Sequence, residues 1–164
     1  MEMNALQVFI DRLSKGDTIG LAEMPESFIY DCQKVLLSLG ERAGGRHDKR
    51  ISSLRHFFVP DQYIREITMK KGSIIVTRKH LVDHVFIISK GVVTVFVPGE
   101  GISILQAPYT GITKAGTKRL LYVNEETIWT TTHPNKSNEK CPDKVVIEVT
   151  EIEDSEFENI ELLS

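Results

Sequence analysis

Two closely spaced histidines are the residues of this sequence with the clearest potential for chemistry. His80 and His84 stand four positions apart in the segment RKHLVDHVFIISKG, just before a β-branched run that ends at Gly91. Neutral imidazoles are common ligands of divalent transition metals, and they also serve as hydrogen-bonded polar residues inside packed sheets. The spacing alone leaves both interpretations open, so the choice depends on the elements that position the pair.

Short β-branched segments, most of them separated by glycines, make up the chain from about residue 57 onward. No pattern of helical length interrupts them, so the sequence predicts an antiparallel sandwich or barrel. Many tight hairpins within one short region favour a jelly-roll barrel. The predicted strands are QYIREITM, GSIIVTR, HVFIIS, GVVTVFVP, GISILQAP, TGITKAG, KRLLYV, TIWTTTH and KVVIEVTEI.

Two amphipathic segments precede this β-rich region. Apolar residues recur at helical spacing in NALQVFIDRLS (4–14), where Asn4 is a candidate cap, and again in PESFIYDCQKVLLSL (25–39). The charged, glycine-rich segment ERAGGRHDKR (41–50) is predicted to be a loop. The helices alone have too little apolar surface to fold, so we expect their stripes to pack on the barrel or on another subunit.

Composition divides the chain into a helical appendage (1–50), a β-barrel (57–150) and an acidic tail (151–164). The whole chain has a net charge of −3, and the tail has six acidic residues and no basic one, which leaves +3 on residues 1–150. No cluster of lysine and arginine accompanies this excess, so a nucleic-acid partner is not indicated. We find no signal peptide and no membrane-spanning stretch, and we therefore expect a cytoplasmic protein without a membrane partner.

Nucleophilic catalysis has little support in the sequence. Cys32 lies in an apolar helical stripe, where a thiol is most often a small core residue, and Cys141 has no base partner in its own segment. Two cysteines in separate segments form neither a CxxC metal pair nor a disulfide framework. We assign no catalytic residue, and a binding protein is favoured over an enzyme.

The segment from 63 to 133 resembles the cupin family, and in particular small cupin-like proteins encoded by tailed bacteriophages. The residues that carry the likeness are the HxxxH pair, the segment from AP to GTKR (107–119) and the ending WTTTH (129–133). The resemblance implies a mainly β fold, a cupin-type jelly-roll barrel or double-stranded β-helix, with an N-terminal helical appendage. It also implies a phage accessory protein that acts in the host cytoplasm.

The two motifs that supply cupin metal ligands are altered in this chain. Counting back from Gly91, His84 takes the place of the acidic ligand in the first motif, His80 that of the second histidine and Arg78 that of the first. In the second motif, KAGTKR (114–119) puts Arg119 at the position of the histidine. Guanidinium groups stay protonated and cannot coordinate a cation, so the full metal set does not carry over.

A metal site remains one interpretation of the pocket. In a cupin barrel the last strand lies beside the strand of the first motif, so the resemblance makes His133 the candidate third ligand beside His80 and His84. Three neutral imidazoles are an adequate set for a divalent transition metal with an open position.

An anion site is the other interpretation. Arg78 and Arg119, at inward ligand positions, favour a carboxylate or a phosphate, and Tyr122 or Trp129 could stack on a base or sugar. Positive charge beside the histidines would lower their pKa values and disfavour a dication, so anion binding is favoured over metal binding.

From these features we expect a non-catalytic or weakly catalytic protein that binds a small anionic ligand, nucleotide-like or carboxylate-like, and sequesters a host metabolite or signalling nucleotide. One alternative is a metal-dependent cupin enzyme that uses the three histidines. Another is a structural or docking component of a phage particle. We further expect a homo-oligomer whose subunits bury the apolar stripes of residues 6–13 and 28–39 between them.

Overall fold

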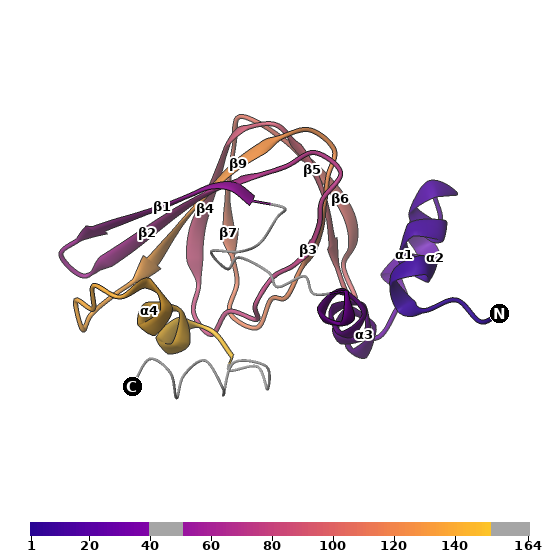
Figure 1. Cartoon of the computed structure of the whole chain (residues 1–164), viewed down its shortest axis with the longest axis horizontal. Helices are drawn as coiled ribbons and strands as arrows, with labels where there is room; N and C mark the ends of the chain where they lie inside the picture. The colour runs from indigo at the N-terminus through magenta and orange to yellow at the C-terminus, as the bar shows by residue number, and fades with distance from the viewer. Residues whose placement is uncertain (40–50, 152–164) are drawn as a thin grey trace.

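The strands form two antiparallel sheets that face each other and enclose the interior of a barrel (Figure 1). The computed structural model describes residues 1–39 and 51–151. In one sheet the order is β1-β2-β9-β4-β7, and in the other it is β3-β8-β5-β6. The strands are β1 (Ile51–Val59), β2 (Gln62–Met69), β3 (Ile74–Val76), β4 (His84–Lys90), β5 (Val92–Val97), β6 (Gly101–Gln106), β7 (Tyr109–Thr113), β8 (Leu120–Val123) and β9 (Thr127–Pro134).

The strand order is that of a jelly roll. The late strands β8 and β9 return between early ones, because β9 pairs with both β2 and β4 and β8 pairs with both β3 and β5. Every recorded pairing is antiparallel, as tight hairpins require. The predicted mainly β fold, a cupin-type barrel with helices at its N-terminal side, is confirmed.

Alternation along the strands separates the barrel interior from its outer surface. In β4, His84, Phe86 and Ile88 are buried, while Val85 and Ile87 between them are exposed. The interior is filled by apolar side chains from both sheets, so it is a packed core over most of its length. Its buried members are Ile67, Met69, Ile75, Phe86, Ile88, Val93, Val95, Leu121, Val123 and Trp129.

The N-terminal helices pack on the outer face of the four-stranded sheet. They are α1 (Ala5–Ser14), α2 (Thr18–Ala22) and α3 (Glu26–Ser38). The predicted cap is confirmed, because Asn4 accepts from the Gln7 amide at 2.9 Å and the Gln7 side chain accepts in return from the Asn4 amide at 3.0 Å. The apolar stripes meet the sheet in one cluster, whose buried members are Leu6, Phe9, Leu21, Phe28, Ile29, Cys32, Leu36, Val76, Phe96 and Leu120.

These contacts decide between the two expected uses of the helical stripes. Phe9 and Phe28 both contact Phe96 of β5, with ring centroids 5.7 Å and 6.1 Å away. Most of both stripes is therefore covered within one subunit, although Ile10 and Leu39 remain 46% and 67% exposed. Burial of the stripes between subunits stays a prediction.

One predicted strand is a helix in the structure. The segment KVVIEVTEI was expected to be extended, but Pro142–Val149 form α4. Pro142 suits a first helical turn, and the buried Val145 and Val149 are four residues apart, which is helical spacing. Burial of this one face outweighs the β propensity of the Val-Val-Ile run.

Two further differences concern the start and the margins of the barrel. β1 begins at residue 51, before the point at which the sequence analysis placed the first strand, and α2 was not predicted. The predicted loop at 41–50 and residues 152–164 of the acidic tail lie outside the described residues. Among the helices of the described part, none combines the length and apolar character needed to cross a membrane.

We expect Cys32 to be unreactive in the folded protein. Its side chain is fully buried, and this burial, with a smaller contribution from Asp31, raises the pKa of the thiol to about 12. At pH 8 only about one thiol in ten thousand would be ionised. Titration with a disulfide reagent should therefore find one reactive thiol, Cys141, in native protein and two in denaturant. Rapid reaction of both thiols in native protein would contradict the burial of Cys32.

Candidate metal centre

Two of the three histidines come from adjacent strands. His84 is the first residue of β4, and His133 lies near the end of β9. The two strands pair at Val85 and Thr132, so the register brings His84 and His133 opposite each other one position further on. Both side chains are buried on the inner face, and their ring centroids are 4.6 Å apart. The sequence analysis placed His84 at the start of the strand HVFIIS and His133 on a neighbouring strand, and the structure has both there.

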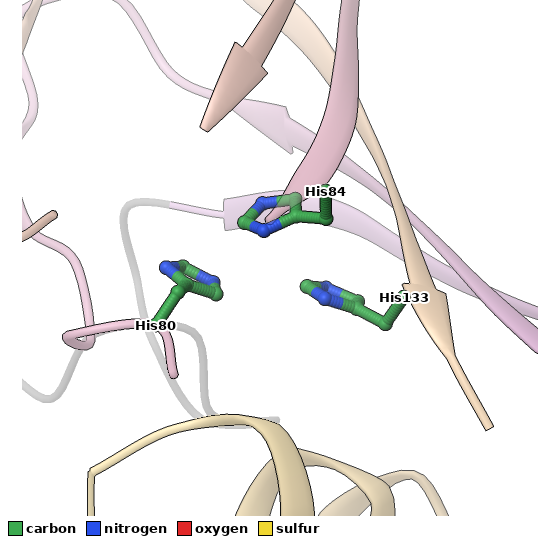
Figure 2. Close-up of side chains that lie close together, drawn as sticks. All are labelled: His80, His84 and His133. Carbon is green, nitrogen blue, oxygen red and sulfur yellow. The ribbon is translucent and has the colours of Figure 1, made fainter. Parts of the chain in front are cut away.

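His80 lies in a loop rather than on a full strand. Its ring centroid is 4.2 Å from that of His84 and 5.6 Å from that of His133 (Figure 2). The backbone of His80 is fixed from one side, because its amide donates to the Thr117 carbonyl at 3.3 Å and its carbonyl accepts from the Gly116 amide at 2.7 Å. The strand-type contact recorded for His80 is an isolated antiparallel bridge with Thr150.

The segment after α4 fixes the His80 loop from the other side. The Leu81 amide donates to the Val149 carbonyl, and the Glu151 amide donates to the Lys79 carbonyl, both at 2.8 Å. The bend after His80 is held by Asp83, whose carboxylate accepts from the Ala115 amide at 2.8 Å. In Figure 2 the helix lies below the histidines, so α4 and its C-terminal extension close this end of the barrel.

The three imidazoles fit a metal ion. One nitrogen from each ring lies within 4.8 Å of the other two. The Nδ1 atoms of His80, His84 and His133 are buried without a hydrogen-bond partner among the described residues. Buried polar atoms are rarely left unpaired, and three rings that each bring one nitrogen to within 4.8 Å of the others are a candidate metal site.

Burial keeps the imidazoles in the neutral form that coordinates metals. Burial, with smaller contributions from the neighbouring imidazoles and from arginine charge, lowers the pKa of His80 to about 2 and that of His133 to about 3. Burial also lowers the pKa of His84, and the positive charge of Arg119 acts in the same direction. All three rings are therefore neutral near pH 7.

Arg119 approaches the histidines, as the sequence analysis predicted. Its guanidinium donates to Thr113 Oγ1 at 2.7 Å and lies over the ring of Phe86, 5.0 Å from the centroid. Burial lowers the pKa of this group, although a guanidinium stays charged under all ordinary conditions. Its charge depresses the pKa values of both His80 and His84, so it lies on their side of the barrel.

A second cation, Arg65, was missed by the sequence analysis. Its charge lowers the pKa values of His80 and His133, whereas the charge of Arg119 lowers those of His80 and His84. On β2 it lies two residues from both Tyr63 and Ile67, which are buried, so it shares their inner face. That alternation is visible in QYIREITM and is the pattern that would have identified it.

Tyr63 packs against the His133 ring. The phenol is fully buried, stacks on His133 at 5.8 Å between centroids and bonds to His56 Nδ1 at 2.7 Å. Burial raises the pKa of Tyr63 to about 12, so it stays protonated. Phe58 stacks near the same phenol at 5.2 Å, and together these contacts fix the orientation of the His133 ring.

Burial, ring contacts and strand alternation place the remaining predicted site residues. Trp129 is buried in the barrel core, stacked on Phe86 at 4.6 Å. Tyr122 alternates with Leu121 and Val123 of the interior and so shares the outer face of β8 with Leu120. Arg78 is half-buried in the segment that leads to His80. Ligand contacts by these three residues stay predictions.

The chain is similar in structure to known cupin-type proteins, at low sequence identity. No protein-family model matches the sequence, and no curated protein matches it. Salicylate 1,2-dioxygenase from Pseudaminobacter salicylatoxidans aligns with 61% of this chain at 15% identity and a TM-score of 0.47, over 30% of its own length. A cupin-2 domain protein from Shewanella frigidimarina aligns with 63% of the chain at 16% identity and a TM-score of 0.44, over 92% of its own length.

A conserved protein of unknown function from Streptococcus pyogenes gives a similar result. It aligns with 62% of the chain at 17% identity and a TM-score of 0.42, over 75% of its own length. The alignment with salicylate 1,2-dioxygenase spans less than a third of that enzyme's own chain. What this chain's own residues establish is a cupin-type β-barrel with a candidate three-histidine metal centre at one end.

Proposed function

We propose that the barrel holds one divalent transition metal at His80, His84 and His133 and binds a small anionic ligand beside it. The observation that carries this proposal is the convergence of three imidazoles whose buried Nδ1 atoms have no partner among the described residues. A purely structural role would leave these polar atoms unpaired at a cost of about 1–3 kcal/mol each.

The donor set indicates the class of metal. Imidazole nitrogens suit zinc, copper, iron and nickel, and three protein ligands leave positions open for a ligand or water. When bound, such an ion supplies a Lewis acid that can polarise a ligand. The protein's own part is to orient the rings through Tyr63 and the His80 loop, and to exclude bulk water with α4.

Metal analysis is the direct test. Protein purified without added ions should contain close to one transition-metal ion per chain by plasma mass spectrometry. If it is purified empty, it should bind one equivalent of Zn²⁺, Mn²⁺, Co²⁺, Ni²⁺ or, without oxygen, Fe²⁺. Failure to bind any of these ions in folded protein would overturn the proposal.

The anionic nature of the ligand is supported by two cations near the histidines. Arg119 and Arg65 together depress the pKa values of all three rings, so the field at the site is positive. The burial of Arg119 makes its charge costly unless an anion compensates it. A carboxylate or phosphate that also occupies an open metal position would meet both requirements.

We predict that Arg119→Met weakens anion binding by about tenfold or more, because methionine keeps much of the packing on Phe86 and removes the charge. Oxalate and inorganic phosphate are suitable probes, titrated by calorimetry into metal-loaded protein. Lys90→Met is the matched control, since Lys90 pairs with Glu126 on the exposed surface. Equal affinities in the Arg119 variant and the control would show that Arg119 does not contact the anion.

The second candidate is a protein that binds an anion without a metal and catalyses no reaction. The partly buried charge of Arg119 favours it, because an anion would compensate that charge. The resemblance to phage-encoded proteins gives this candidate a setting, the sequestration of a host metabolite or signalling nucleotide in the host cytoplasm. Native mass spectrometry of protein taken from cells distinguishes the two. A retained organic anion without metal supports sequestration, and a retained metal supports the first proposal.

A further inference from the structure

Of the three histidines, His80 is the one that lies outside the named strands. Residues 79–81 run beside residues 149–151, joined by the bridge between His80 and Thr150 and by two backbone hydrogen bonds. A pair of segments this short has little stability of its own. The position of the His80 ring therefore depends on what packs against these two segments.

Helix α3 contacts both segments with side chains from one of its faces. Glu26 and Tyr30 are four residues apart, so they lie on neighbouring turns of the same face. The Glu26 carboxylate pairs with Lys79 Nζ at 2.9 Å, and the Tyr30 hydroxyl donates to the Glu151 carboxylate at 2.9 Å. Lys79 and Glu151 each stand next to a residue of the bridge. In Figure 1, α3 accordingly lies toward the barrel end that α4 closes.

The ring of Tyr30 also contacts the segment on the other side of His80. Lys118 is 3% exposed, and its Nζ lies over the Tyr30 ring, 4.9 Å from the centroid. Cation–π attraction favours this arrangement for a buried ammonium group. The neighbour of Lys118, Thr117, accepts from the His80 amide. Tyr30 thus contacts, through its hydroxyl and its ring, the two segments that hold the backbone of the His80 loop.

The hydroxyl of Tyr30 is a constant donor in this arrangement. Burial, with a smaller contribution from the bond to Glu151, raises the pKa of Tyr30 to about 12, so the group stays protonated. A hydrogen bond to a carboxylate is stronger than one between neutral groups. Phenylalanine at this position would keep the ring and lose only this bond, which separates the two contacts.

We propose that Tyr30 is a positioning residue for the metal centre, which it reaches through the His80 loop without touching a metal. This inference rests on the proposed function, in which His80 binds the ion together with the other two histidines. An imidazole on a loosened loop has to be ordered when the ion binds, and the cost of this ordering lowers the affinity. The helical layer supplies none of the three ligands and yet contributes to how tightly the ion is held.

The variant Tyr30→Phe tests the proposal through measurements with and without metal. In metal-free protein, hydrogen exchange of the Leu81 and Glu151 amides should become about threefold faster or more, while exchange in β4 and β5 stays unchanged. The Zn²⁺ affinity, measured by chelator competition, should fall by about tenfold, the low end of the range for residues that orient a ligand. The stoichiometry should stay the same because all three imidazoles remain. In Co²⁺-loaded protein, the visible absorption bands should shift, because the His80 ring is held less firmly.

Variants of Glu151 show whether Tyr30 acts through its hydrogen bond. Glu151→Ala should lower the Zn²⁺ affinity as Tyr30→Phe does, and the double variant should be no weaker than either single one. Glu151→Gln should restore most of the affinity, because its amide oxygen still accepts from the phenol. A double variant whose loss equals the sum of the two single losses would overturn the proposed route.

Asp31→Asn is the matched control on the same helix. Asp31 pairs with Lys34 on the exposed surface at 3.8 Å, so this variant should keep the exchange rates and the affinity of the wild type. The proposal is overturned if Tyr30→Phe leaves exchange of the His80 loop unchanged, if it leaves the Zn²⁺ affinity and the Co²⁺ spectrum unchanged, or if Asp31→Asn has an equal effect. Failure of the proposed function gives a different result, because wild-type protein itself then binds no ion. That result would overturn the positioning role as well.

Discussion

Replacing His84 by alanine is expected to reduce the bound metal from about one ion per chain to less than about a tenth. Loss of one of three protein ligands should weaken metal affinity by on the order of 100-fold or more, beyond the 10–100-fold typical of residues that only orient a ligand. His84→Gln retains most of the side-chain volume and should lose metal in the same way. Competition with a chromogenic chelator measures both affinities.

His56→Ala provides the control for the histidine variants. His56 bonds to Tyr63 and is outside the group of three convergent rings, so this variant should still bind one ion per chain. The metal affinity of this variant should fall only slightly. The loss would arise because Tyr63, without its bond to His56, holds the His133 ring less firmly. If His84→Ala binds metal as tightly as wild type while His56→Ala does not, the metal is held elsewhere.

Replacing Phe96 by alanine is expected to cost about 3–5 kcal/mol in the free energy of unfolding. Phe96 is fully buried, and its ring joins Phe9 of α1 and Phe28 of α3 to the four-stranded sheet. The cavity would remove the contact that holds both helices at once. Urea denaturation monitored by circular dichroism gives the change in stability, and faster proteolysis of residues 1–39 should accompany it.

The surface residue Ile19 is the comparison for Phe96. It is 74% exposed on α2, so Ile19→Ala should change the unfolding free energy by less than about 0.5 kcal/mol. A similar small effect for Phe96→Ala would mean that the helices are held mainly by other contacts. A large effect confined to Phe96→Ala confirms the shared core.

Strand alternation and turn glycines are enough to predict most of the barrel. The burial of His84, Phe86 and Ile88 follows the alternation in HVFIIS. The first strand is less evident, because its inner positions include His56, a polar residue whose place inside depends on its bond to Tyr63. The helix α4 has local β propensity, and only the burial of Val145 and Val149 against the rest of the fold makes it helical.

Part of the candidate site could also be predicted from the sequence. The spacing of His84 from Gly91, compared with the cupin motif, and the place of WTTTH on the last strand of such a barrel made His84 and His133 candidates. Arg65 joins the site only through the pairing of β2 with β9, a contact between residues far apart in the chain. Pairings of this kind cannot be read from one segment, so motif spacing directed attention to Arg78 and Arg119 and passed over Arg65.

The bridge between His80 and Thr150 has a consequence for the order in which the chain is synthesised. His84 and His133 belong to strands that can pair as soon as β9 has left the ribosome, but the His80 loop is also held by the backbone bonds from Leu81 to Val149 and from Glu151 to Lys79. A nascent chain that lacks residues 149–151 presents two fixed imidazoles and a third on an untethered loop. A metal site formed by these three histidines would therefore be complete only after residues 149–151 have been synthesised.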